Sequence, residues 1–249
     1  MSIKIKTDRE IGLIRDSCRL TAEILARAGE WVKPGITTEE INTFVHEKTI
    51  KAGAIPSPLN YHGFPKSVCT SVNNVVCHGI PGTQVLKDGD IINIDVTCLL
   101  HGYHGDSSAT FFVGQVSPKI RKLVEVTEST MEEGIAAAAP DGYFNDIGAA
   151  IQDMVEEYGY GIVREFCGHG IGRNFHEDPM VLHYRSKNRG DRIQEGMVFT
   201  IEPMLNIGAP GVYVANDGWT VFTKDGSVSA QFEHTIAMTR NGPEVLTRL

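Results

Sequence analysis

The sequence lacks three features that would each place it in a different class of protein. No stretch approaches the roughly 18 consecutive apolar residues of a transmembrane helix, and the first residues contain no apolar signal-peptide core. The five cysteines are an odd number without a C-x-x-C pair, which argues against a disulfide framework and a zinc-thiolate site. No low-complexity linker divides the chain. We therefore expect a cytoplasmic protein with reduced thiols and no membrane partner.

Positive charge is also scarce. The chain has 23 Lys and Arg against 31 Asp and Glu, and its net charge is −8. This balance argues against binding to nucleic acid, sequence-specific binding included. A local basic cluster is formed by Arg185, Lys187, Arg189 and Arg192. A solvated loop is enough to explain this cluster, so it is not assigned as a docking surface.

The elements that the sequence predicts occur twice in the same order. With 41% hydrophobic residues, the chain can bury a sizeable core. Capping-box patterns at Thr7 and Thr37 predict two helices, and strand-like runs follow them. A second pair of helices is predicted after Ser117, again followed by strands. We therefore expect one α+β domain over the whole chain, built from two related halves of about 1–116 and 117–249.

Four acidic residues interrupt strand-like runs. Asp95 stands in IINIDV, where Asp is normally disfavoured, and Asp106 begins DSSATFFV after a turn. Glu202 and Glu233 are predicted to lie inside apolar strands of the second half. The polar face of a single hairpin could simply contact water. Isolated buried carboxylates are costly, however, so a shared cation is the more economical explanation of all four.

A histidine completes this acidic set. His169 lies between glycines, and His176 follows in the same segment with Phe175 beside it. A neutral imidazole is the commonest metal ligand among side chains. One histidine with four carboxylates suits two ions of Co²⁺, Mn²⁺, Fe²⁺ or Zn²⁺, whose charge the carboxylates balance. Turn or surface positions, or the opposite strand face, are expected for His46, His62, His101, His104, His183 and His234.

With these residues in place, the chain resembles the type I methionine aminopeptidases, which remove the initiator Met from new proteins. The resemblance rests on the ordered segments NIDV, HGD, CGHGIG, TIEP and EHT and covers nearly the whole chain. It implies the pita-bread fold, in which two pseudo-symmetric halves surround a central antiparallel sheet and a dimetal cleft. The short interval between His176 and Glu202, and the lack of an N-terminal zinc-binding extension, match the compact prokaryotic form.

The resemblance implies a role for each matching ligand. Asp95 would chelate one ion and His169 would bind the other, and Asp106 and Glu233 would bridge the two. Glu202 would be a ligand and would also transfer the proton of the metal-bridging hydroxide that attacks the peptide carbonyl.

The resemblance also implies residues that contact the substrate. His78 would contact the scissile amide or the leaving group, and His176 would stabilise the oxyanion. Aromatic rings and sulfur suit a Met thioether, because polarizable sulfur packs well against ring edges. The residues that match the family's Met pocket are Tyr61, Phe64, Cys69, His78, Phe175, His176 and Trp219.

Two further features follow from the same resemblance. Asn73, Val75 and Ser229 match a monovalent-cation site of some members. Pro58 stands at a pocket rim where the family often has Cys, so preferences that depend on that thiol do not transfer.

The implied substrates are N-terminal Met peptides and nascent chains with a small second residue, with transient ribosome association. Because Ser2 is small, we expect Met1 of this chain to be removed in cells. A glycosidase-like hydrolase would also use paired carboxylates, but it would resist chelators and would not need His169. A binding module of the same fold would usually lack several ligands, and proline-specific peptidases generally carry a large N-terminal domain that is not expected here.

Overall fold

The computed structural model describes residues 3–249. Met1 and Ser2, on which the predicted self-processing depends, lie outside the described residues. No helix in the described part of the chain is long and apolar enough to cross a membrane.

Within residues 3–249, four α-helices form two pairs, one in each half of the chain. Both capping boxes that the sequence predicts are present: Thr7 accepts a hydrogen bond from the Glu10 amide, and Thr37 accepts one from the Glu40 amide. The helices are α1 (Asp8–Trp31), α2 (Thr38–Lys51), α3 (Pro118–Ala137) and α4 (Phe144–Glu156).

The strands between the helices pair only in antiparallel fashion among the described residues. The first half contains β1 (Ile55–Pro56), the short 3-10 helix η1 (Tyr61–Gly63), β2 (Cys69–Val72), β3 (Val75–Cys77), β4 (Ile91–Leu100) and β5 (Tyr103–Phe112). The second half contains β6 (Gly161–Ile162), β7 (Gly168–Gly170), β8 (Glu177–Val181), β9 (Val198–Ile201), β10 (Met204–Asn206), β11 (Val212–Val214), β12 (Val221–Thr223), β13 (Ser229–Gln231), β14 (His234–Thr239) and β15 (Gly242–Val245).

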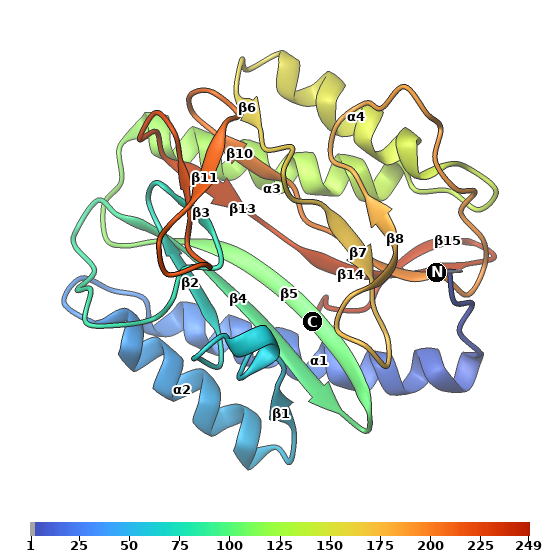
Figure 1. The fold of residues 1–249 in the computed structure, drawn as a ribbon, viewed down its shortest axis with the longest axis horizontal. Helices are drawn as coiled ribbons and strands as arrows, with labels where there is room; N and C mark the ends of the chain where they lie inside the picture. The colour runs from blue at the N-terminus through green and yellow to red at the C-terminus, as the bar shows by residue number, and fades with distance from the viewer. Residues whose placement is uncertain (1–2) are drawn as a thin grey trace.

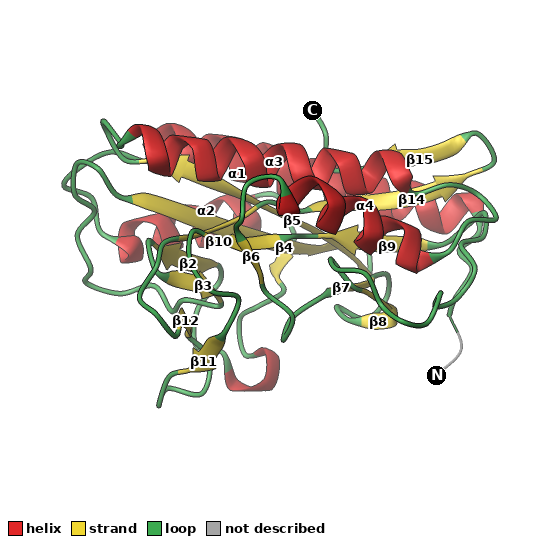
Figure 2. Cartoon of the chain, turned by 90° about the horizontal axis from the view of Figure 1, so that it is seen from above, coloured by secondary structure: helices red, strands yellow, loops and turns green. Residues whose placement is uncertain are grey.

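Two larger sheets meet in the middle of the molecule. In the first sheet, β4 pairs with β5 and also with the shorter strands β1 and β2. The second sheet has the order β15-β14-β9-β7-β8. The smaller sheets have the orders β13-β10-β6 and β11-β12-β3. Figure 1 shows the α1–α2 pair and the α3–α4 pair at opposite ends of the view, with these strands between them. In Figure 2, α1 and α3 run along one side of the strands, and β11 and β12 lie on the other.

The long hairpin β4–β5 is held tightly against α1. A Cβ on Gly105 would lie 2.4 Å from the backbone nitrogen of Cys18, so glycine is required at this crossing. Thr21 donates a hydrogen bond to the carbonyl oxygen of Gly105, and Ser17 donates one to that of Cys98. The helix therefore fixes the backbone immediately before Asp106.

The polar face of this hairpin is directed into the protein. The register places Asp95 opposite Ser108 and Thr97 opposite Asp106. Thr97, Asp106 and Ser108 are all buried. Contact with water, the simpler explanation of this polar row, is therefore wrong. Two acids of this row, Asp95 and Asp106, instead line a cavity between the two halves.

Candidate metal centre and substrate pocket

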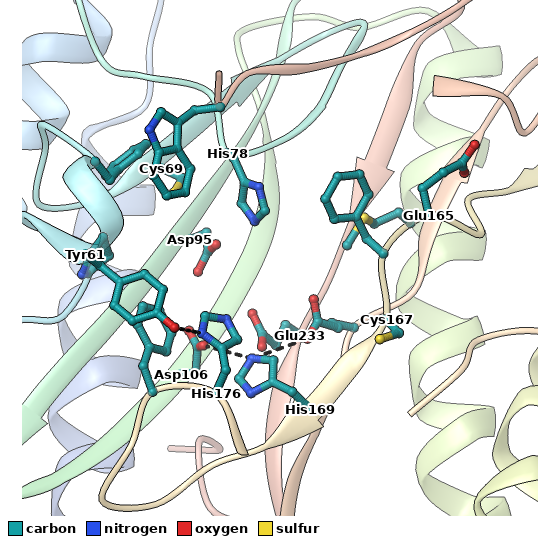
Figure 3. A pocket seen from close by; sticks show the side chains of 17 residues that line it. Tyr61, Cys69, His78, Asp95, Asp106, Glu165, Cys167, His169, His176 and Glu233 are labelled. Atoms are coloured by element: carbon teal, nitrogen blue, oxygen red, sulfur yellow. Dashed lines mark hydrogen bonds and ion pairs between the residues drawn. The ribbon is translucent and has the colours of Figure 1, made fainter. Parts of the chain in front are cut away.

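A cavity of about 290 Å³ brings the predicted site residues together. All five predicted metal ligands line it: Asp95, Asp106, His169, Glu202 and Glu233. All seven predicted substrate contacts line it as well: Tyr61, Phe64, Cys69, His78, Phe175, His176 and Trp219. Figure 3 shows Asp95, Asp106 and Glu233 on the floor of the cavity with His169 and His176 beside them. The sequence did not indicate four further lining residues: Glu165, Phe166, Cys167 and Met204.

Two of the acids do not lie inside strands as the sequence predicts. Glu202 follows the end of β9, and Glu233 lies between β13 and β14. At both points the chain leaves one sheet and enters another. The apolar runs continue across these breaks, which is why each reads as a single strand. Glu233 still forms an isolated antiparallel bridge with Ser108, so it lies beside the hairpin residue that faces Asp95.

Three of the five residues form a compact ligand set. One oxygen of Asp106, one oxygen of Glu233 and one ring nitrogen of His169 all lie within 4.8 Å of one another. The Nε2 atom of His169 is also 3.7 Å from Asp106 Oδ2 and 3.7 Å from Glu202 Oε1. His169, which the sequence places between flexible glycines, is held in β7.

The carboxylates fit a cationic occupant. Burial raises the pKa of Asp95 to about 7 and that of Glu202 to about 8, and it raises the pKa of Asp106 and Glu233 well above the usual range. Within residues 3–249, Asp95 Oδ1 and Glu233 Oε1 are buried without a hydrogen-bond partner. Divalent ions would satisfy these oxygens and compensate the clustered charge.

The tautomer of His169 also suits a metal ligand. Its Nδ1 lies 2.9 Å from the carbonyl oxygen of Gly170, and because a carbonyl only accepts, Nδ1 carries the proton. Burial lowers the pKa of His169 to about 4, so the ring is neutral at neutral pH. The lone pair of Nε2 therefore faces the carboxylates, as a metal ligand requires.

Hydroxyl groups orient the carboxylates from each half. Thr97 donates to Asp106 Oδ1 at 2.7 Å, and Thr200 donates to Glu202 Oε1 at 2.7 Å. The same Thr200 hydroxyl accepts a hydrogen bond from the amide of His169 at 3.0 Å. These bonds hold the ligands from outside the cavity.

Sequence reasoning missed the position of His183. A surface or turn position was expected, but the side chain is 1% exposed, and its Nε2 accepts a hydrogen bond from the Glu202 amide at 3.0 Å. Burial lowers its pKa to about 3. The apolar residues before it, VL, are the only local signal of burial, and they do not identify its partner.

His104 also differs from its expected place in a turn. It lies in β5, where its Nδ1 is 2.8 Å from the hydroxyl of Ser57 and its ring stacks on Phe175 at a centroid distance of 5.5 Å. The strand begins at Tyr103, three residues before Asp106, where the sequence predicts its start. His104 therefore supports the wall of the cavity.

Aromatic rings form the apolar side of the cavity. Phe64 packs edge-on against Trp219 at 5.3 Å between ring centroids, and Trp219 is 6.3 Å from the ring of His78. Phe166 contacts the other side of His78 at 5.4 Å. Burial lowers the pKa of His78 to about 4, so this imidazole is neutral in the cavity. Pro58 also lines the cavity, as the sequence predicts.

Two of the three residues of the predicted monovalent-cation site, Asn73 and Ser229, are hydrogen-bonded to each other. The carbonyl oxygen of Asn73 accepts a hydrogen bond from the amide of Ser229 at 2.9 Å, and the Asn73 side chain donates to Asp90. Within residues 3–249, the Ser229 hydroxyl is buried without a hydrogen-bond partner. The cation site stays a prediction.

Two of the four residues of the basic cluster form ion pairs within the chain. Arg185 makes a two-pronged ion pair with Asp153 of α4, and Arg192 lies 3.5 Å from Asp141. Arg189 stacks over the ring of Tyr143 at 3.8 Å. These contacts fasten the loop to the α4 region.

The chain matches the model of metallopeptidase family M24 over residues 12–240. The chain belongs to this family. It is 52% identical over 247 residues to methionine aminopeptidase A of Synechocystis sp., covering 99% of this chain and 98% of that protein. The crystal structure of methionine aminopeptidase from Rickettsia prowazekii superimposes with a TM-score of 0.97 at 47% identity, covering 99% of this chain and 100% of that one. The present chain is thus a metal-dependent peptidase with the pita-bread fold.

Proline-specific relatives are more distant. Prolidase from Pyrococcus furiosus matches this M24 chain with a TM-score of 0.77 at 25% identity, covering 98% of this chain but 65% of the prolidase. The resemblance to the compact type I methionine aminopeptidases is therefore confirmed. The roles of the individual site residues stay predictions.

Proposed function

We propose that this M24 enzyme removes the initiator Met from nascent proteins whose second residue is small. The observation that carries the proposal is the meeting of two surfaces in one cavity. A cluster of carboxylates and an imidazole forms its floor, and aromatic rings with the Cys69 side chain form its wall. Such a wall suits a thioether, because sulfur packs favourably against aromatic edges.

The five clustered residues would hold two divalent ions, drawn from Co²⁺, Mn²⁺, Fe²⁺ and Zn²⁺. Asp95 would hold one ion and His169 the other, with Asp106 and Glu233 shared between them and Glu202 completing the set. When bound, such ions polarise a peptide carbonyl and acidify the attacking water. Four carboxylates balance the charge of two divalent ions, which supports this number.

The chain's own residues would then divide the remaining work. Glu202 would take a proton from the attacking water and return it to the leaving amine, the role of a general base and acid. His176 would donate a hydrogen bond to the oxygen on which negative charge develops. His78 would contact the nitrogen of the scissile amide. Phe64 and Trp219 would fix the Met side chain, so that its peptide bond lies above the carboxylates.

The test is hydrolysis of Met-Ala-Ser by purified protein before and after chelation, with each of the four metals added back. We expect release of Met that stops on chelation and returns with metal. A glycosidase-like mechanism predicts no response to chelators, and a proline-specific peptidase predicts preference for an Xaa-Pro dipeptide. If no metal restored Met release, the proposal would be wrong.

A pocket variant separates binding from chemistry. Trp219→Ala removes apolar contact that is made equally in the ground state and the transition state. We therefore expect a higher KM for Met-Ala-Ser with little change in kcat. An unchanged KM would exclude Trp219 from the Met pocket.

We also propose transient association with the ribosome in the cytoplasm, because the substrate is a nascent chain. A single catalytic domain with pseudo-repeat halves of about 1–116 and 117–249 is part of the same proposal. Cosedimentation of the purified protein with ribosomes, compared with sedimentation of the protein alone, tests the association. Sedimentation that is independent of ribosomes would contradict it.

A further inference from the structure

One hydrogen bond crosses the mouth of the cavity between the two halves of the chain. The hydroxyl of Tyr61, in η1 of the first half, lies 2.8 Å from Nδ1 of His176, in the segment before β8. Figure 3 shows this bond as a dashed line from the Tyr61 ring to the His176 ring. The two residues are 115 positions apart in the sequence, so the fold brings them together.

The backbone around Tyr61 is strained in a way that presents this side chain. Asn60 and His62, on either side of it, both adopt the left-handed region, with φ of 66° and 47°. This region is unfavourable for most residues other than glycine, and although Asn and His adopt it more readily than most, two such residues around one position persist only where the surroundings hold them. Here the turn is closed by hydrogen bonds from the Asn60 amide to the Phe64 carbonyl and from the Phe64 amide to the Tyr61 carbonyl. The turn therefore fixes where Tyr61 points.

Ring packing fixes the orientation of both partners. The Tyr61 ring lies 4.9 Å from that of Phe175 and 5.2 Å from that of His176, centroid to centroid. Phe175 stacks on His176 at 4.3 Å and on His104 at 5.5 Å, and His104 is anchored to Ser57. These ring contacts orient the imidazole of His176, which is itself exposed. The position of the ring proton is set separately, by its hydrogen-bond partner.

A neutral imidazole carries one proton, and the partner of one nitrogen determines which nitrogen has it. If the Tyr61 hydroxyl donates to Nδ1, the proton is on Nε2, the nitrogen left for the substrate. If Nδ1 donates to the phenol oxygen, Nε2 can only accept. The oxyanion role proposed above requires a donor, and a phenol is a better donor than acceptor toward a neutral imidazole. The two requirements agree on the same tautomer.

We propose that Tyr61 is a positioning residue: its hydroxyl donates to Nδ1 of His176 and so places the ring proton on Nε2, where it can be donated to the oxygen of the scissile carbonyl. This inference rests on the proposed function. It gives the Tyr61 hydroxyl a role that differs from that of its ring, which is a wall of the Met pocket. Removing the hydroxyl alone should therefore affect the chemical step rather than binding of Met.

The test is Tyr61→Phe, which keeps the ring and removes only the hydroxyl. We expect kcat for Met-Ala-Ser to fall roughly 10-fold, the rate equivalent of one lost hydrogen bond, with KM and metal content unchanged. In a His176→Ala background the same substitution should cause no further loss, because the group that it positions is gone. Tyr213→Phe, which removes an exposed phenol hydroxyl on β11, is the matched control and should change nothing.

Nitrogen-15 NMR of the histidine rings reads the tautomer directly and does not require turnover. In the wild-type protein, we expect Nε2 of His176 to be protonated and Nδ1 to have the shift of an acceptor, and Tyr61→Phe should mix the two tautomers. A proton on Nδ1 in the wild type, or equal losses from Tyr61→Phe with and without His176, would overturn the inference. A wild-type protein that shows the expected tautomer but does not release Met would refute the proposed function instead.

Discussion

The two halves of the chain deliver carboxylates to the same cavity by different backbone routes. Asp95 and Asp106 lie within two ten-residue strands, β4 and β5, whose continuous pairing fixes the backbone on both sides. Glu202 and Glu233 lie where strands end and the chain passes to another sheet. The pseudo-symmetry of the helices therefore does not extend to the way in which the ligands are held.

This difference shows what a strand break requires. Beyond the end of β9, the amide of Glu202 has no strand partner, and the buried imidazole of His183 accepts its hydrogen bond. The Glu233 backbone is tied to the first half instead, since its amide donates to the Ser108 carbonyl and its carbonyl accepts from the Ser107 hydroxyl. The backbones of the two second-half carboxylates, Glu202 and Glu233, are therefore held by a side chain and by the first half. In the first half, β4 and β5 hold each other by strand pairing.

The largest effect should come from Asp106, where the two halves meet. Asp106→Asn keeps the shape but removes the charge that two ions would share. We expect activity toward Met-Ala-Ser to fall by roughly 10⁴-fold or more, the size of loss seen when one of several catalytic residues that act together is removed. Bound metal should be lost as well. Metal analysis and turnover of the same sample check this, with the exposed Asp16→Asn as control. Two retained metals with near-normal turnover would contradict the shared-ligand role.

The two histidines of one segment should fail in different ways. His169→Ala should lose metal, because Nε2 faces the carboxylates. His176→Ala should keep metal and KM but lose roughly 10² to 10³ in kcat, the usual loss for one oxyanion donor. Metal content and steady-state kinetics of both variants decide between the roles. Release of metal from His176→Ala would show that the roles are divided incorrectly.

A matched pair of threonines tests the comparison of the halves directly. Thr97→Val and Thr200→Val each remove one hydroxyl that is 2.7 Å from a carboxylate. Loss of such outer support typically weakens metal affinity about 10- to 100-fold. We expect the larger loss of metal affinity for Thr200→Val. The Thr200 hydroxyl also accepts a hydrogen bond from the amide of His169, so its removal affects two ligands. Equal losses, measured by metal titration, would mean that both halves hold their ligands equally well.

The smallest effect concerns stability without metal. Burial raises the folded-state pKa of Asp95 to about 7 and of Glu202 to about 8, so the folded protein holds protons that the unfolded chain has released. Buried histidines, whose pKa values are lowered, have the opposite effect below their usual pKa of 6.5. Above that range, the free energy of unfolding of the chelated protein should therefore decrease as pH rises from about 7 to about 8. Thermal unfolding across this range measures the slope. Asp95→Asn should reduce the slope, and an unchanged slope would show that Asp95 does not titrate in this window.

Local sequence patterns were enough for the helices and for the β4–β5 hairpin. The capping boxes at Thr7 and Thr37 start helices where predicted, because the bonds that form them lie within one turn. Asn93, Asp95 and Thr97 share one face of β4, because the alternation of side chains along a strand alone determines this.

The remaining features depend on contacts between distant segments. The run VFTIEPML reads as one strand, yet the change of sheet at Glu202 is determined by which neighbours pair with each side of it. His183 has no pattern that identifies it, because its partner is the amide of Glu202, which is distant in sequence and lies just beyond the end of β9. The bond from Tyr61 to His176 depends likewise on a turn and a loop from opposite halves.

The central claim is that carboxylates from both halves form a single site for two divalent ions. Titration of the metal-free protein with Co²⁺ or Mn²⁺, followed by calorimetry and by Met-Ala-Ser hydrolysis, tests this most directly. We expect two ions bound per chain, with activity appearing as they bind, and loss of this stoichiometry in both Asp106→Asn and Glu233→Gln. Full activity without bound metal, or an unchanged stoichiometry in both variants, would contradict it.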